Sequence, residues 1–477
     1  MASTEGDAMR TWRRAMTVGA VALFGLSGCA WVQRADVRDD GMSPATALQR
    51  ARDLSVSDDG ESVSFITPAA LVPADTNGTD DLYRRDFQGS GAGIRLIPTA
   101  ADIDQWFAKS RGDAVEYFFT SRLQLTADDT NDHPDVYVRN VDDSSLRRIS
   151  VGTTGEIAGS LSASLNAVTS DGSHVLLLVQ QADGDHTYLR DRDAGTTTEI
   201  PLGDTESAVD LSSSGALVMI LTNNNGLATV TLKATFAPDT ETLACQVTNA
   251  RFAANGAYVL GNFVGGPNCP TGLARYQSGG GYEPAPVPAG TEAVVQGVDK
   301  DGRYVLWSPN DASGQMFVTS FLTNRTQRVS EGGFPPVAGP VEAASLSLDG
   351  STVALLADTP FPGAGPDNGA NGVVVRTTFG PIVDVPNPAA VVRGAPPVSV
   401  QLVVHDSWEG GFFPIDFGPG TLVTVASSNS DGAGTTHLQL SVSAGANTPS
   451  GPRNVTVFER HRFGYSSGVC LNCINLN

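Results

Sequence analysis

A short turn that holds Asp, Ser or Asn beside Gly recurs along this chain, usually just before an apolar run suited to a β-strand. Such Gly-containing turns supply the positive φ angles that tight hairpins need. Successive turn glycines lie about 40 to 60 residues apart, and a recurrence of this kind is typical of stacked structural repeats. The turns are 57–60, 110–113, 170–172, 213–215, 254–256, 300–302 and 348–350.

Further alternating segments follow most of these turns and complete a unit of about four strands. Residues 81–86 and 135–140 illustrate the next strand, and residues 146–150 illustrate the one after it. A four-stranded meander has two apolar faces, which it can bury only by stacking against neighbouring copies. The sequence therefore predicts an all-β protein with a β-propeller of about seven blades, one for each turn. Six or eight blades fit the same spacing.

Four phrases in the first blades resemble the TolB-type β-propeller repeat: SDDGESVSFIT, PADTNGTDDLYRRD, TADDTNDHPDVYVRN and SDGSHVLLLV. These repeats are related to the Trp-Asp (WD40-like) repeats. The likeness covers residues 45–386, so the propeller domain is expected there. The resemblance implies that the blade faces or the central channel dock proteins or peptides.

Residues 387–477 have a different pattern, and prolines at positions 386, 388, 396 and 397 mark a linker at its start. Alternating strands fill most of this part. The segments 417–420 and 448–457 resemble the immunoglobulin-like IPT/TIG domains of bacterial surface proteins. The resemblance implies a small Ig-like β-sandwich that spaces or docks, and about 90 residues is a suitable size for one.

The first residues have the pattern of an export signal. Three arginines precede an uncharged apolar stretch, 15–24, which is too short to span a bilayer but suits a signal peptide. The stretch leads into Leu-Ser-Gly-Cys at 26–29, which resembles the lipobox of bacterial lipoproteins. We therefore expect a signal peptide at 1–28, a lipid on Cys29 and a polar tether over 29–44. A plain secretory signal is the alternative, and an Arg pair leaves the twin-arginine route open.

The cysteines fit a compartment outside the cytoplasm. If Cys29 takes the lipid, four of the five cysteines remain, an even number that can form disulfides. Three pairings are open, and proximity in sequence favours Cys245 with Cys269 and Cys470 with Cys473. The last pair could also suggest zinc, but no second Cys pair or His pair completes such a site. Two structural disulfides are expected.

Two acidic turns are candidates for a metal site, because clustered carboxylates and amides offer the oxygen ligands that Ca²⁺ prefers. Neither turn has the glutamate that completes an EF-hand loop, and Asp and Asn also favour turns for their own backbone hydrogen bonds. A structural turn is the main interpretation, with no cofactor, and calcium is the alternative. The candidate ligands are Asp75, Asn77, Asp81, Asp129, Asn131 and Asp135.

No residue pattern indicates a catalytic centre. The six histidines are not paired at metal-ligand spacing, and residues 464–468 have the letters of a nucleophile elbow without its strand, helix and downstream His. No matched acid–base pair is recognisable in the propeller loops. The predicted function is a non-catalytic scaffold that binds an envelope protein, peptide or glycan. A propeller hydrolase or lyase acting on envelope glycan or peptide is the alternative.

The net charge of −21 narrows the classes of partner. Nucleic acid binding depends on cationic contacts with phosphate, and a polybasic attachment to anionic lipid needs the same charge. Both are disfavoured, so contact with a membrane is expected through the lipid on Cys29. The protein is predicted to be exported and anchored to the cell membrane or outer membrane, facing the periplasm or the cell exterior.

Overall fold

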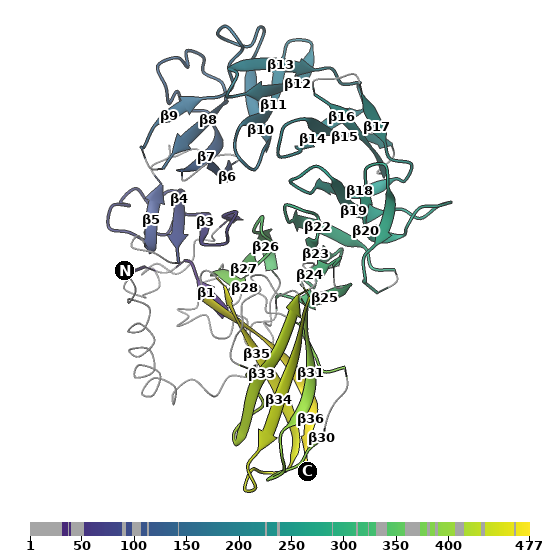
Figure 1. Cartoon of the computed structure of the whole chain (residues 1–477). Helices are drawn as coiled ribbons and strands as arrows, with labels where there is room; N and C mark the ends of the chain where they lie inside the picture. The colour runs from purple at the N-terminus through teal and green to yellow at the C-terminus, as the bar shows by residue number, and fades with distance from the viewer. Residues whose placement is uncertain are drawn as a thin grey trace, which may run out of the picture.

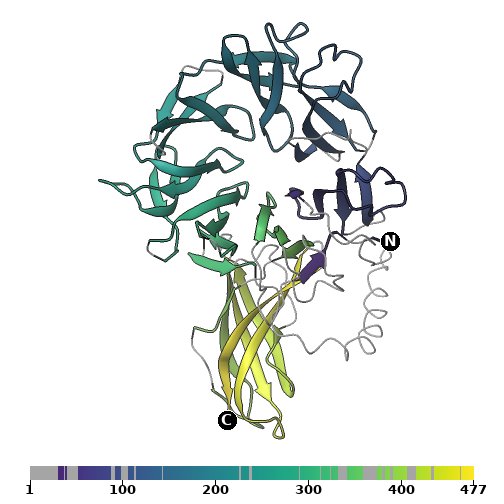
Figure 2. The same ribbon diagram turned by 180° about the vertical axis from the view of Figure 1, so that it is seen from behind.

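All secondary structure in the described part of the chain is β-strand. Figures 1 and 2 show a ring of sheets, with a second body that extends from one side of the ring beside β25 and β28. The computed structural model describes residues 31–36, 38–39, 52–87, 92–97, 106–111, 114–141, 143–224, 227–235, 239–288, 290–311, 313–322, 324–330, 341–357, 373–378, 382–386, 390–405, 415–430, 435–461 and 464–477.

The strands from β2 to β25 form six antiparallel meanders of four strands each, which are the first six blades of the ring. The fourth and fifth meanders are joined into one sheet by the single pairing of Ala228 with Val247. Blade one contains β2 (Arg52–Val56), β3 (Ser62–Thr67), β4 (Asp81–Asp86) and β5 (Gly93–Ile97). Blade two contains β6 (Trp106–Arg111), β7 (Ala114–Ser121), β8 (Asp135–Asn140) and β9 (Leu146–Arg148). Blade three contains β10 (Ser162–Val168), β11 (His174–Gln181), β12 (Gly184–Asp191) and β13 (Thr196–Ile200). Blade four contains β14 (Glu206–Leu211), β15 (Leu217–Asn224), β16 (Leu227–Ala234) and β17 (Thr240–Thr242). Blade five contains β18 (Val247–Phe252), β19 (Tyr258–Phe263), β20 (Gly272–Gln277) and β21 (Gly281–Pro284). Blade six contains β22 (Ala293–Val298), β23 (Tyr304–Pro309), β24 (Phe317–Ser320) and β25 (Arg325–Arg328).

The last blade takes its outermost strand from the other end of the chain. Its strands are β26 (Val341–Leu346), β27 (Thr352–Ala357), β28 (Val373–Thr378) and β1 (Trp31–Arg34), which pairs antiparallel with β28. The residues after β1 contact the first blade, where Arg85 Nη1 lies 2.9 Å from Asp39 Oδ1 and Arg85 Nε donates to the Ala35 carbonyl. Residues 31–34, expected as part of a polar tether, are instead a paired strand, because they satisfy the backbone groups on the edge of β28.

Neighbouring blades bury their apolar faces against each other. The innermost strands contact in a closed ring, in the order β2, β6, β10, β14, β18, β22, β26 and back to β2. Between the second and third blades, for example, Phe118 and Val138 pack with Leu165 and Leu177. Because both faces of a blade are covered, β3 and β27 are buried along their whole length.

The remaining strands form two four-stranded sheets around one apolar core, which makes this part a β-sandwich. The core includes Leu402, Leu440, Val442 and Val455. One sheet has the order β29 (Ile382–Asp384), β31 (Val398–His405), β34 (Thr436–Ala444) and β33 (Thr421–Ser430). The other has the order β30 (Ala390–Val391), β36 (Gly464–Leu476), β35 (Gly451–His461) and β32 (Ile415–Asp416).

The start of the sandwich differs from the expected boundary after residue 386. β29 pairs with β31, so its three residues belong to the sandwich rather than to the propeller. The backbone groups of β29 are satisfied by β31 and not by a blade, which no local pattern in the sequence indicates. That the sandwich is an IPT/TIG-like domain stays a prediction.

Two of the expected cysteines are joined in the structure. Cys245 and Cys269 form a disulfide that connects the start of blade five to the loop after β19, with their Cα atoms 5.5 Å apart. The side chains of Cys470 and Cys473, on β36, lie outside the described part of the structure, as do Cys29 and the expected signal peptide. Among the described residues, no helix has the length and apolar character needed to cross a membrane.

Candidate functional site

The first hairpin turns of the blades gather at one end of the ring. We call this end the turn face, defined by residues 57–60, 170–172, 213–215, 254–256, 300–302 and 348–350. Each turn joins the innermost strand of a blade to the next strand, so it lies beside the centre of the ring. Part of the turn in blade two, residues 112–113, lies outside the described residues.

Backbone hydrogen bonds run from turn to turn across the blades. Asn255 N donates to the Lys300 carbonyl at 2.8 Å, and Lys300 N donates to the Leu348 carbonyl at 2.8 Å. Asp349 N then donates to the Asp58 carbonyl at 3.1 Å, which joins the last blade to the first. The turns of blades five and six, the last blade and blade one are therefore linked to each other in a row. These bonds have no local signal in the sequence, because their partners belong to different repeats.

A second repeated contact fixes five of the turns to their own blades. In five blades, a side-chain oxygen that precedes the turn accepts the backbone N–H of the residue five positions later. The pairs are Ser57 with Ser62 at 2.9 Å, Thr169 with His174 at 3.0 Å, Ser212 with Leu217 at 3.0 Å, Asp299 with Tyr304 at 2.7 Å and Ser347 with Thr352 at 2.9 Å. The spacing of five is a signal in the sequence that could have identified this contact.

Of the charged side chains exposed on the turn face, most are acidic. Asp59, Asp171 and Asp349 are exposed, and Lys300 is the exposed cation among the turn residues defined above. Burial opposes ionisation of Asp171, but hydrogen bonds from Ser173 outweigh it and hold the pKa of Asp171 below its ordinary value. The turn face therefore presents carboxylates whose orientation is held by hydrogen bonds within the same turn. These carboxylates suit a partner with cationic groups or hydrogen-bond donors.

Gly215 shows why glycine is required on this face. Its φ is +66°, and a Cβ atom there would lie 2.5 Å from Cγ of His174 in the preceding blade. We expect Gly215→Ala to lower the free energy of unfolding by about 2 kcal/mol, from the left-handed backbone and the clash together. Gly195 is a matched control, because its φ is +68° and nothing lies within 4 Å of its Cβ position. Urea unfolding should show a smaller loss for Gly195→Ala; equal losses would contradict the clash.

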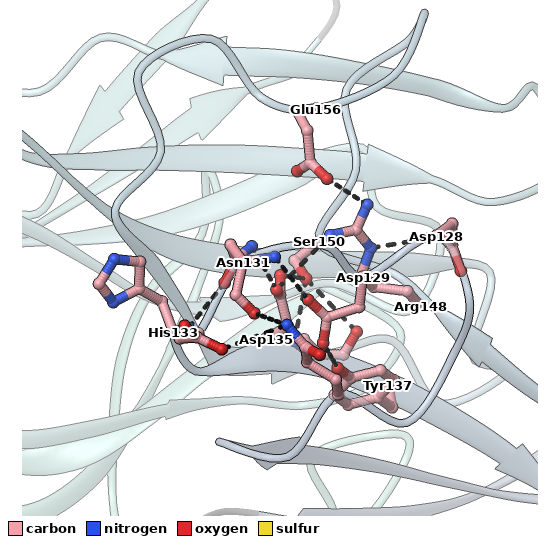
Figure 3. A network of polar contacts seen from close by, with 12 residues as sticks. Asp128, Asp129, Asn131, His133, Asp135, Tyr137, Arg148, Ser150 and Glu156 are labelled. Atoms are coloured by element: carbon pink, nitrogen blue, oxygen red, sulfur yellow. Dashed lines mark hydrogen bonds and ion pairs between the residues drawn. The ribbon is translucent and has the colours of Figure 1, made fainter.

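The acidic loop of blade two is a turn held by side-chain hydrogen bonds (Figure 3). Tyr137 Oη donates to Asp129 Oδ2, and Asn131 N donates to Asp129 Oδ1 at 3.3 Å. Asn131 Nδ2 donates to Asp135 Oδ2 at 2.9 Å. Ser150 Oγ donates to the other oxygen of Asp135. Within the loop, these carboxylate oxygens therefore already have hydrogen-bond donors.

A cation of the protein itself lies beside this loop. The side chain of Arg148 is almost fully buried and lies 3.5 Å from Asp135, 3.4 Å from Asp128 and within bonding distance of Glu156. Burial raises the pKa of Asp135, although its hydrogen bonds with Ser150 and Asn131 and the charge of Arg148 lower it. The guanidinium thus supplies the positive charge that a metal ion would otherwise bring to this loop.

The equivalent loop of blade one lacks that cation. Tyr83 Oη donates to Asp75 Oδ2, and Asn77 N lies 3.4 Å from Asp75 Oδ1, as in blade two. However, the strand register places Leu96 opposite Tyr83, where blade two has Arg148 opposite Tyr137. Asp81 Oδ2 is buried without a hydrogen-bond partner, and burial raises the pKa of Asp81.

Calcium binding at these loops stays a prediction. In the described part of the chain, no group of three or more His, Cys, Asp or Glu side chains is arranged to hold a metal ion. Isothermal titration with Ca²⁺ would test the idea directly, and blade one, with its unpartnered Asp81 oxygen, is where heat of binding would be expected.

The tyrosine contacts of these loops are testable. Tyr137→Phe keeps the ring that stacks on Phe119 at 5.8 Å between centroids, but removes the donor to Asp129, which is 4% exposed. We expect a loss of about 2 kcal/mol, the usual cost of a buried acceptor left without its donor. Thermal unfolding followed by circular dichroism measures it. An unchanged melting temperature would contradict a structural role for the pair.

From the sequence, His133 and His186 are both expected to be solvated turn residues in loops before a blade strand, but His186 differs in the structure. It lies within β12, and its ring nitrogens face Glu199 at 2.8 Å and Asp183 at 3.1 Å. The hydrogen bond with Glu199 raises the pKa of His186. His133 does lie in an exposed turn, where its backbone N–H donates to Asn131 Oδ1 at 2.7 Å.

No protein-family model and no curated protein matches the sequence. Similar solved structures include an oligogalacturonate lyase from Vibrio parahaemolyticus, with a TM-score of 0.47 and 11% identity over 73% of this chain and 97% of that chain. The β-propeller domain of the Trilobed protease from Pyrococcus furiosus has a TM-score of 0.44 and 11% identity over 66% of this chain and 91% of that one. TolB from Acinetobacter baumannii has a TM-score of 0.35 and 13% identity over 58% of this chain and 65% of that one.

Likenesses this distant carry no inference about activity or partners. The fold class rests on the strand pairing, the closed ring of innermost strands and the separate core of the last two sheets. This chain is therefore an all-β protein that combines a β-propeller with a β-sandwich.

Proposed function

We propose that this protein is a non-catalytic envelope lipoprotein whose propeller is a binding scaffold for a protein, peptide or glycan. The observation that supports the proposal best is the turn face, because the turns of blades five and six, the last blade and blade one are joined by backbone hydrogen bonds from blade to blade. A binding surface that is ordered in advance loses little conformational entropy when a partner docks. Loops that a rigid scaffold positions are also where binding residues concentrate.

The charge on the turn face suggests the chemistry of the partner. Asp59, Asp171 and Asp349 are exposed around the ring, and the whole chain carries a net charge of −21. Complementary charge speeds the encounter of two partners and selects among them. The partner is thus expected to present basic side chains or a dense set of hydrogen-bond donors.

Site-specific photo-crosslinking in the native envelope tests the scaffold. A photoreactive amino acid is placed at Asp59 or Asp349 on the turn face, and at Asn77 or Asp183 in hairpins at the opposite ends of their strands. A discrete adduct from the turn-face positions, with none from the other two, is the expected result. Adducts of equal yield from both sets, or none from any position, would overturn the proposal.

The lipid anchor is tested separately. Cys29→Ser is expected to move the protein from the membrane fraction to the soluble fraction, because acyl chains supply the apolar attachment that the acidic chain does not. Trp31, where β1 begins, is only the second residue after Cys29, so the anchor would hold the last blade close to the membrane. Fractionation with and without detergent measures the change, and identical behaviour of the two forms would remove the anchor.

A further inference from the structure

Two hairpin connections in the described part of the chain contain an Asn-Gly pair: Asn77-Gly78 in blade one and Asn255-Gly256 in blade five. Asparagine is a chemically labile residue, because the backbone nitrogen of the next residue can attack its side-chain carbonyl carbon. Glycine leaves that nitrogen most accessible, since it has no Cβ and a freely moving backbone. The structure separates the two pairs by the surroundings of the glycine.

The asparagine side chains of the two pairs are held alike. Thr79 N donates to Asn77 Oδ1 at 2.9 Å, and Ala257 N donates to Asn255 Oδ1 at 2.9 Å. Such a donor stabilises the negative charge that develops on Oδ1 when a nitrogen attacks Cγ. Both asparagines are also exposed. The two amides are therefore equally suited to be attacked, and the glycine nitrogen decides which of them reacts.

The nitrogen of Gly256 is engaged in the structure. Its N–H donates to the Ala253 carbonyl at 2.8 Å, and the residue is buried. A Cβ atom at this position would lie 2.8 Å from Cβ of Ser212 in the preceding blade. Attack by this nitrogen on Asn255 would break a backbone hydrogen bond and move the turn against its neighbour. The packing of the turn face therefore protects Asn255.

Gly78 has neither constraint. It is exposed in the loop between β3 and β4, and no atom beyond its chain neighbours lies within 4 Å of its Cβ position. Among the described residues, no acceptor binds its N–H. Exposed loops of this kind are where a backbone opens most easily. The Gly78 nitrogen can therefore approach the Asn77 side chain without breaking a hydrogen bond or displacing a neighbour.

We propose that Asn77 is a site of spontaneous deamidation, which destabilises the loop between β3 and β4. The Gly78 nitrogen loses its proton to solvent and attacks Cγ of Asn77, and the side-chain nitrogen takes up a proton and leaves as ammonia. Water then opens the resulting succinimide ring at either carbonyl and leaves an aspartate or a β-aspartyl linkage. The amide and water are thus converted into a carboxylic acid and ammonia. The reaction needs no enzyme and is independent of what the turn face binds.

The destabilisation follows from what the Asn77 amide does in the acidic loop of blade one. Burial raises the pKa of Asp81, and the hydrogen bond from Asn77 opposes this rise. The Oδ2 atom of Asp81 is buried without a hydrogen-bond partner. Deamidation replaces the amide donor with a carboxylate, so Asp81 loses its hydrogen bond and gains a like charge nearby. Asp75 adds to this repulsion.

Peptide mapping by mass spectrometry tests the proposal on the folded full chain in detergent, sampled during incubation at mildly alkaline pH. The peptide that contains Asn77 should gain the mass of an amide-to-acid conversion, with part of it in the β-aspartyl form. Asn255 should convert about tenfold more slowly or slower still, because its glycine nitrogen reacts only when the turn opens. The chain unfolded in urea is the matched control, in which the two pairs should react at similar rates.

Two variants locate the reaction and its effect. Asn77→Gln should keep its mass during the incubation, because the longer side chain forms the ring much less readily. Asn77→Asp carries the charge of the product and should melt at a lower temperature than the wild type. Equal conversion of the two pairs in the folded chain, no conversion of Asn77 there, or an Asn77→Asp variant that melts as the wild type does would overturn the proposal.

Discussion

Replacing Arg192 with methionine is expected to destabilise the propeller by about 3–5 kcal/mol, the usual cost of leaving one partner of a buried ion pair alone. Arg192 follows β12 in blade three, and its two Nη atoms lie 2.7 and 3.0 Å from the carboxylate oxygens of Glu116 in blade two. Both side chains are about nine-tenths buried. The guanidinium also donates to the Gly172 carbonyl and covers the ring of Phe118.

The double variant Glu116→Leu/Arg192→Met distinguishes the contribution of the ion pair to stability from that of the apolar packing of the two side chains. Removing both charges leaves no buried carboxylate without a partner, so the double variant should be more stable than Arg192→Met alone. The midpoint of urea unfolding is the measurement. Losses that simply add in the double variant would show that the two side chains act independently, contrary to the bidentate geometry.

The turn chemistry could be predicted from the sequence because it is local. Asp-Gly and Ser-Gly set the backbone of a hairpin within four residues, and Gly172, Gly215 and Gly302 indeed have φ near +67°. What these glycines contact could not be predicted. The Cβ position of Gly302 lies 2.9 Å from Tyr258, which belongs to the preceding blade.

The closure of the ring depends on pairs that are remote in sequence. Trp31 pairs with Thr378, and nothing in the short segment 31–34 by itself indicates a strand rather than a tether. Arg192 and Glu116 are 76 residues apart, so their ion pair has no local signal. Sequence repeats predict that blades stack, but they do not predict which side chains hold one blade against the next.

The structure of the acidic loops could be predicted in part: their turns are local, but some of their contacts come from residues that are remote in sequence. The Asp and Asn residues indicated turns, and the same hydrogen bonds occur in both loops. The tyrosine donors have a signal in the sequence as well, because the spacing of eight residues from Asp75 to Tyr83 repeats from Asp129 to Tyr137. Only the register of the next strand shows that Arg148 supports one loop and that Leu96 stands in its place in the other.

The second large effect that we expect is a loss of folding stability with rising pH, caused by ionisation of Asp299. Four other blades use a Ser or Thr hydroxyl to accept the N–H five residues later, whereas blade six uses the carboxylate of Asp299, which is 0% exposed. Burial raises the pKa of Asp299 from an ordinary value of 3.8 to about 6, even though the Tyr304 N–H and Arg303 lower it. Because the folded pKa is higher than the unfolded one, stability from this group is complete below pH 3.8 and is lost as the pH rises to about 6.

Asp299→Ser is therefore expected to stabilise the protein at neutral pH and to matter little in acid. A pKa difference of about two units corresponds to about 3 kcal/mol at full ionisation, so the advantage of the variant should grow by about 2 kcal/mol between pH 4.5 and pH 7.5. Urea unfolding of both proteins at the two pH values measures this difference, since other titrating groups cancel. Ser347→Asp is the reciprocal variant: it places a carboxylate in the equivalent, fully buried position of the last blade and should acquire the same loss of stability with rising pH. A stability difference that stays constant between the two pH values would contradict the role of the Asp299 charge, because only ionisation makes this carboxylate differ from the hydroxyls of the other blades as the pH rises.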